Sequence, residues 1–149
     1  MKPRHLAPLL AGLLLAGTAH AAQADHVRAS HAWIRLLPGD LPAGGYVTLA
    51  NDGDRAARLD GASSPDYAQA MLHRSTMRGG MSEMTMIDHL DVPAHGQVAL
   101  APAGYHLMLM KAAHPLKPGD KVQVILRFAD GSALPVAFTA RSANATGAD

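Results

Sequence analysis

Short segments of alternating apolar and polar residues, separated by turn residues, constrain the fold of this chain more than any other feature. Successive side chains of a β-strand point to opposite faces, so such alternation predicts half-buried strands, whereas an amphipathic helix needs apolar residues at 3.6-residue spacing. No convincing stripe of that helical kind occurs. The expected strands are 27–35, 45–49, 56–59, 67–77, 82–87, 97–100, 105–111, 121–128 and 134–140. About eight or nine strands at this spacing predict an all-β fold, a Greek-key β-sandwich.

The last two expected strands carry the clearest local signals. Asp130-Gly131 lies between two apolar runs and predicts a hairpin. Pro135 lies inside the final run, and proline has no N–H to donate to a sheet. We therefore expect that strand at an edge of the sheet, or starting after the proline. Residues 141–149 are small and polar and are expected to form a disordered tail.

The first 21 residues predict a secretory signal peptide. Residues 1–5 are basic, residues 6–17 are apolar, and Ala19-His20-Ala21 is a small-x-small cleavage site. The apolar stretch is too short to span a membrane, and no second one follows. No cysteine follows the cleavage site, so a lipid anchor is not expected. The expected mature product is a single domain, residues 22–149, located in the periplasm and without a membrane span.

Charge and cysteine content exclude several classes of protein. Removal of Lys2 and Arg4 with the signal peptide leaves 11 basic and 12 acidic residues. A chain with this balance has no basic face for nucleic acid or for an anionic membrane surface. The sequence contains no cysteine, so neither a disulfide nor a thiolate ligand is available. A domain of 128 residues can still stabilise itself by burying an apolar core.

Two histidines and two methionines form a candidate metal site, with the spacing His73-(10 residues)-Met84-(21 residues)-His106-x-Met108. Thioether sulfur favours monovalent copper over hard cations, and imidazole binds copper well. Neither ligand has to lose a proton to bind, which suits an oxidising compartment. Alternate residues of a strand share a face, so the His-x-Met unit presents both ligands on one side. His73 and Met84 must come from an adjacent strand and from the segment after Gly79-Gly80.

The same spacing resembles the signature of the periplasmic copper chaperones of the PCuAC family. Further matching segments are residues 44–49 followed by Asn51, 62–65, 102–110 and 115–120, and the resemblance spans roughly residues 26 to 140. It implies a cupredoxin-like sandwich that binds Cu(I) through His73, Met84, His106 and Met108. It also implies delivery of copper to the copper centres of a haem-copper (cytochrome c) oxidase, with Sco-type proteins as co-workers. The His/Met-rich C-terminal extension of some family members does not occur here.

Five further methionines have more than one interpretation. Met71 and Met77 share strand parity with His73, Met86 shares it with Met84, and Met110 with Met108. They could line a Met-rich mouth, pack as flexible apolar residues or form a docking surface. Met81 and Met86 are possible auxiliary ligands. The remaining mature histidines are expected to be solvated or structural, namely His26, His31, His89, His95 and His114.

Three functions remain open at this level, and a fourth is not expected. A copper carrier and a copper-sequestering protein would use the same site, and a metal-free module would use the methionines for packing. An enzyme is not expected, because a catalytic copper site binds through His or carboxylate and keeps an open position. A blue-copper electron carrier needs a cysteine thiolate, which the chain lacks.

Overall fold

The structure is a computed structural model that describes residues 20–149. The predicted signal peptide, apart from its last two residues, lies outside the described part of the chain. Within residues 20–149 the chain forms ten strands, one short 3-10 helix and no α-helix. The elements are η1 (Gln23–His26), β1 (Val27–Arg35), β2 (Ala43–Asn51), β3 (Ala57–Ser63), β4 (Tyr67–Arg78), β5 (Met81–Met86), β6 (Leu90–Val92), β7 (Gly96–Leu100), β8 (Tyr105–Ala112), β9 (Lys121–Phe128) and β10 (Ala133–Arg141). None of the helices found in residues 20–149 has the length and apolarity needed to span a membrane.

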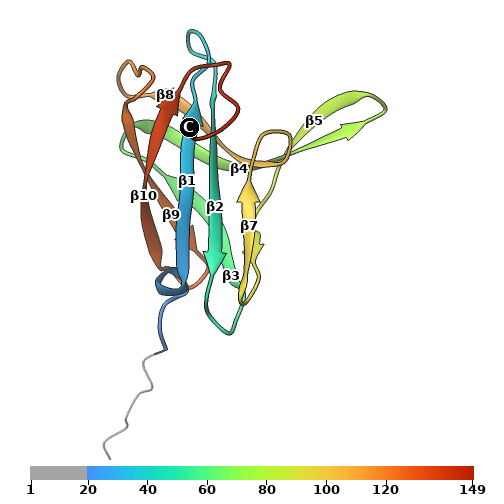
Figure 1. Cartoon of the computed structure of the whole chain (residues 1–149), viewed down its shortest axis with the longest axis vertical. Coiled ribbons are helices and arrows are strands. Elements are labelled where there is room, and N and C mark those ends of the chain that lie inside the picture. The colour runs from blue at the N-terminus through green and yellow to red at the C-terminus, as the bar shows by residue number, and fades with distance from the viewer. Residues whose placement is uncertain (1–19) are drawn as a thin grey trace, which may run out of the picture.

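The strands form one continuous sheet that folds over on itself (Figure 1). Their order is β5-β4-β8-β2-β1-β10-β9-β3-β6, and β7 pairs with β2 beside this path. All recorded pairs are antiparallel except β1 with β10. Although β3 and β4 lie far apart in this order, both bury side chains in the same core, for example Leu59 and Leu72. The two halves of the sheet are therefore the two layers of a sandwich.

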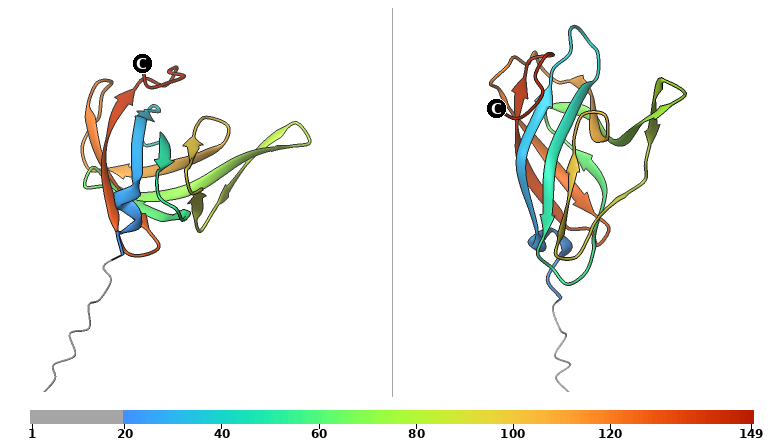
Figure 2. Two further views of the ribbon diagram at one scale, coloured as in Figure 1. Left: turned by 60° about the horizontal axis from the view of Figure 1, so that its bottom comes forward. Right: turned by 45° about the vertical axis from the view of Figure 1, so that its right-hand side comes forward.

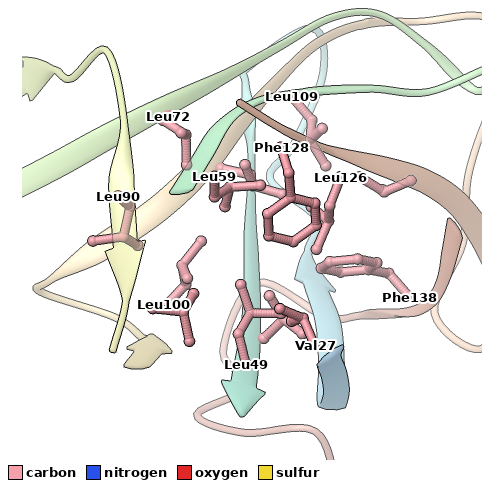
Figure 3. Close-up of a cluster of buried hydrophobic side chains, with 14 of the residues drawn as sticks. Val27, Leu49, Leu59, Leu72, Leu90, Leu100, Leu109, Leu126, Phe128 and Phe138 are labelled. Atoms are coloured by element: carbon pink, nitrogen blue, oxygen red, sulfur yellow. The ribbon is translucent and has the colours of Figure 1, made fainter. Parts of the chain in front are cut away.

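The core lies between these layers and is built from alternate residues of nearly every strand. Figure 3 shows Leu59 and Phe128 beside Leu126 and Phe138, with Leu72 on the side of Leu59. In β9 the buried residues fall at every second position, as a strand with one face in the core requires. The prediction of an all-β sandwich is confirmed.

The structure has one strand more than the sequence predicts. The extra strand is β6, which is only three residues long and pairs with β3. Three residues are too few to display an alternating pattern, and the residues around Pro93 have the composition of a loop. The short strand is therefore defined by its partner and not by its own sequence.

The expectation that the last strand lies at an edge is wrong for the strand as a whole. β10 lies between β1 and β9 and includes Pro135, which pairs with Ile125. The parallel pairing with β1 begins only at Thr139, so the first part of β10 has β9 as its recorded partner. Proline is tolerated because its side of the strand is unpaired at that point.

The segment after β10 is hydrogen-bonded to the body at Arg35. The Arg35 guanidinium donates two hydrogen bonds to the carbonyl oxygen of Ala145, at 3.1 and 2.8 Å. The same guanidinium lies over the rings of Trp33 and Tyr46. The domain limits, including a disordered tail at 141–149, stay predictions.

The β4–β5 hairpin stands away from the sandwich in all three views (Figures 1 and 2). β4 pairs with β8 as far as Arg74, and beyond that point its recorded pairing is with β5. Gly79 and Gly80 form the turn with φ of 57° and 79°, a conformation that glycine adopts without strain. All six residues of β5 are exposed. The end of β4, residues 76–78, is therefore exposed to solvent together with β5.

Candidate metal centre

The register between β4 and β8 places His73 directly opposite His106. Directly opposed residues of an antiparallel pair point to the same face of the sheet. The two imidazole rings have centroids 5.7 Å apart and meet edge to face at 63°. Leu72 and Leu107, which pair one position along, point into the core. The core face of these strands thus fixes the two histidines on the outer face.

His106 is buried, with an exposed fraction of 6%, and its orientation is set by a backbone hydrogen bond. Its Nδ1 lies 3.2 Å from the carbonyl oxygen of Gly104. A carbonyl can only accept, so Nδ1 carries the proton and donates, and the lone pair of the neutral ring is on Nε2. Histidine ligands of metals are commonly oriented in this way. His106 therefore offers Nε2 as a donor to an ion.

His73, the residue opposite His106, has a ring nitrogen without a hydrogen-bond partner. Its Nδ1 is buried, and no atom of residues 20–149 forms a hydrogen bond with it. A buried polar atom without a partner is costly, and binding an ion would remove that cost. Burial lowers the pKa of the His73 ring, and the neighbouring His106 lowers it further. The neutral imidazole that a metal requires is thus the favoured state.

The two methionines of the predicted site lie on the same outer face at different depths. Met108 pairs with Met71, two positions along from the histidine pair and therefore on the same face, and is partly buried. Met84 lies on β5 opposite Ser75 and is 56% exposed. The structure thus brings His73, His106 and Met108 together and places Met84 diagonally across from His73, on the hairpin.

A group of aromatic residues continues this outer face on β1 and β2. Gly44 pairs with Met108, and an added Cβ at Gly44 would lie 2.6 Å from the hydroxyl oxygen of Tyr46. Tyr46 therefore lies across Gly44, beside the strand that carries Met108. Trp33 packs against Tyr46 with ring centroids 4.6 Å apart. The absence of a side chain at Gly44 allows these rings to cover the sheet next to the site.

The donor set suits a soft monovalent ion. It consists of two imidazoles and thioethers, with no carboxylate among the residues of the site. No group of three or more His, Cys, Asp or Glu side chains positioned to hold a metal occurs in residues 20–149. A hard or divalent cation would prefer oxygen ligands or a larger set of imidazoles. The residues present therefore fit Cu(I) or a similar soft ion.

Comparison with known proteins agrees with this geometry. Residues 27–140 match the model of a protein family described as "Putative lipoprotein LpqE-like". The chain belongs to the LpqE-like family. One curated relative, "Putative lipoprotein Lxx21020" from Leifsonia xyli subsp. xyli, is 36% identical over 116 residues, which cover 77% of this chain and 69% of the relative.

Several solved structures share the fold of this LpqE-like chain. The solution structure of apo-DR1885 from Deinococcus radiodurans is 34% identical, covers 95% of both chains and has a TM-score of 0.60. The CuI form of DR1885 is 35% identical, with a TM-score of 0.62 over 83% of this chain and 81% of that one. A copper-bound PCuAC domain from PmoF2, at 22% identity, shares the fold with a TM-score of 0.67 over 83% of this chain and 98% of that one. The LpqE-like chain thus has the fold of PCuAC domains, and the predicted cupredoxin-like fold is confirmed.

The other methionines of the LpqE-like chain separate according to their strand register. Met86 pairs with His73, and Met71 pairs with Met108, so both share the outer face with the site. Met81 pairs with Arg78 and lies on the opposite face of the hairpin. Met81 and Met84 are an odd number of residues apart, so they point to opposite faces of the strand. This parity already separates Met81 from the predicted ligands in the sequence. Of the two possible auxiliary ligands, Met86 is therefore placed to act and Met81 is not.

Three of the other histidines are paired with carboxylates outside the candidate metal centre. His26 lies 3.1 Å from Asp52, His95 lies 2.7 Å from Asp54, and His114 lies 3.0 Å from Asp66. A fourth, His31, has its Nδ1 3.2 Å from the hydroxyl of Ser30. The three carboxylate pairs join loops and strand ends of the body, whereas the His31 contact lies within β1. They are separate from the candidate metal centre.

Proposed function

We propose that this LpqE-like chain is a periplasmic copper chaperone. It binds Cu(I) through His73, Met84, His106 and Met108 and delivers it to the copper centres of a haem-copper oxidase. The chain acts as a carrier and not as an enzyme, with the ion as its cargo. A Sco-type protein is a further expected partner in the delivery.

One observation carries this proposal. The β4–β8 register pairs two imidazoles, one with an unpaired buried nitrogen and one held by a backbone carbonyl, beside a thioether. Such a set binds Cu(I) without losing a proton. The related protein DR1885, 35% identical to this chain, has a structure in its CuI form. The likeness supports the same cargo here.

The difference in exposure between the two ends of the site favours delivery over storage alone. His106 is buried and rigid, whereas Met84 on the hairpin is exposed to solvent. An ion held between them can be reached by the ligands of a recipient from the hairpin side, and thioether ligands can be exchanged one at a time. Copper sequestration for tolerance would use the same residues, so it is the competing function.

An anaerobic titration tests the site. The mature protein would compete with a chromophoric chelator for Cu(I), beside the variants His106→Ala and Met108→Leu. We expect one tightly held ion per chain and losses of at least about tenfold in affinity for both variants. Circular dichroism would verify that each variant is folded. Unchanged affinity in both folded variants would show that these residues are not ligands.

A deletion strain separates delivery from sequestration. A delivery protein predicts loss of oxidase activity that added copper restores, and the wild-type gene but not the His106→Ala variant should complement the defect. Sensitivity to copper with normal oxidase activity would instead establish sequestration.

A further inference from the structure

Met86 occupies a position that the predicted ligand set leaves out. The registers of β5 with β4 and of β4 with β8 place Met86, His73 and His106 in one row across three strands. Met84 lies two residues away from Met86 on β5, at the next position on the same face, opposite Ser75. Because directly paired residues share a face, all of these side chains project from the same side of the sheet.

This register puts Met86 nearer to His73 than Met84 is. Directly opposed residues have Cβ atoms about 4.5–5.5 Å apart, whereas diagonal neighbours are about 7–8 Å apart. Met86 is the direct neighbour of His73, and Met84 is the diagonal one. Both side chains are long and unbranched, so both can turn a sulfur atom toward an ion held at His73.

Core packing does not explain why a methionine occupies position 86. Its exposed fraction is 63%, so most of the side chain is in water and contributes little to the core. Met84 is similarly exposed at 56%, whereas His106 at the other end of the row is buried. The donors of the outer face thus run from a buried end on β8 to a solvent-exposed end on β5.

We propose that Met86 is a ligand of the carried ion, interchangeable with Met84 as its outermost thioether. This inference rests on the proposed function and refines it. As one thioether donates its lone pair to the ion, the other leaves, and neither a proton nor an electron is transferred. His73, His106 and Met108 hold the ion throughout. The exchange keeps the ion bound while its solvent-facing position opens to a donor from the recipient.

Leucine substitutions on β5 test the exchange, because leucine keeps the size and apolarity of methionine and removes the sulfur. Met81→Leu is the matched control, since Met81 lies on the same strand, is 74% exposed and faces the other side. Met84→Leu and Met86→Leu should each lower Cu(I) affinity only a few-fold, because the other thioether substitutes. The double variant Met84→Leu/Met86→Leu should lose at least about another tenfold relative to Met84→Leu alone.

The control double variant Met84→Leu/Met81→Leu should bind like Met84→Leu. If the two double variants bind equally, Met86 is not a ligand and the inference is overturned. Failure of the wild-type chain to bind Cu(I) at all is a different result, which overturns the proposed function and this inference with it.

An independent readout uses Ag(I), a soft monovalent ion that is stable in air, with methionine methyl groups labelled with carbon-13. One equivalent of Ag(I) should shift the Met86 methyl resonance in the wild type and shift it further in Met84→Leu. The Met81 resonance should stay in place in both. A Met86 resonance that moves no more than that of Met81 would contradict the exchange.

Discussion

The body of the sandwich and the β4–β5 hairpin are built from the same kind of strand but meet water in opposite ways. In β9 every second side chain is fully buried, including Val122, Val124 and Leu126. In β5 all six residues are exposed, although three of them are methionines. A gathering of exposed apolar side chains marks a binding surface more often than a packing one. The body therefore supplies stability and the hairpin supplies access to the site.

β8 shows how the two regions are joined. Leu107 and Leu109 are fully buried on its inner face, while His106 and Met108 lie on its outer face. Successive residues of one strand thus serve the core and the site in turn. The candidate ligands on β8 are held between packed neighbours, whereas the candidate donors on β5 have exposed neighbours.

The largest effect is expected from truncation in the body. Leu107→Ala should lower the free energy of unfolding by about 2–5 kcal/mol, because it leaves a cavity between the layers of the sandwich. Urea denaturation measures the change. The matched control Leu41→Ala removes a leucine that is 60% exposed and should change stability by less than about 0.5 kcal/mol. Equal losses of stability in both variants would contradict the assignment of Leu107 to the core and of Leu41 to the surface.

A smaller effect is expected on the outer face beside the site. Gly44→Ala places a Cβ 2.6 Å from the Tyr46 hydroxyl oxygen and should cost about 1–3 kcal/mol of stability. The double variant Gly44→Ala/Tyr46→Phe lacks that oxygen and should recover part of the loss in the same denaturation assay. If the double variant is no more stable than Gly44→Ala alone, the clash with the hydroxyl is not the cause.

A charge contact in the body should give a smaller effect that depends on pH. Asp66 hydrogen-bonds to His114 and raises its pKa, and the bond with His114 together with one from the Gln123 backbone lowers the pKa of Asp66. A raised histidine pKa stabilises the fold at low pH and loses that effect as pH rises through it. A lowered aspartate pKa loses its effect as pH falls through it. The contact therefore stabilises most between the two pKa values.

His114→Gln should accordingly lower the melting temperature most in mildly acidic buffer. The difference from wild type should shrink when the pH is raised above the pKa of His114. His31→Gln is a control, because its neighbour Ser30 carries no charge. A difference that does not vary with pH would exclude the ion pair as its source.

The smallest effect is expected on the hairpin itself. Met81→Ser should change the free energy of unfolding by less than about 0.5 kcal/mol, because the side chain is largely in solvent and faces away from the site. Cu(I) affinity should also stay at the wild-type value. A loss of more than about 1 kcal/mol would show that the hairpin packs against the body after all.

Much of the fold was accessible from local patterns. The hairpin at Asp130-Gly131 and the strands of the body follow from period-2 alternation and turn chemistry, which act between neighbours in sequence. β6 was missed because three residues carry no pattern. The position of β10 was misjudged because Pro135 is tolerated by a local gap between β1 and β10, which no local signal reports.

The sequence by itself determined the types of the donors and their faces within each strand. Two imidazoles, the thioethers and the absence of cysteine predict a soft ion, and strand parity alone puts His106 and Met108 on one side and separates Met81 from Met84. Only the tertiary structure decided which strands are neighbours and in which register. Met86 lies beside His73, and His73 beside His106, because backbone hydrogen bonds pair segments that a local pattern cannot align. A shift of one residue in either register would move every donor of that strand to the opposite face.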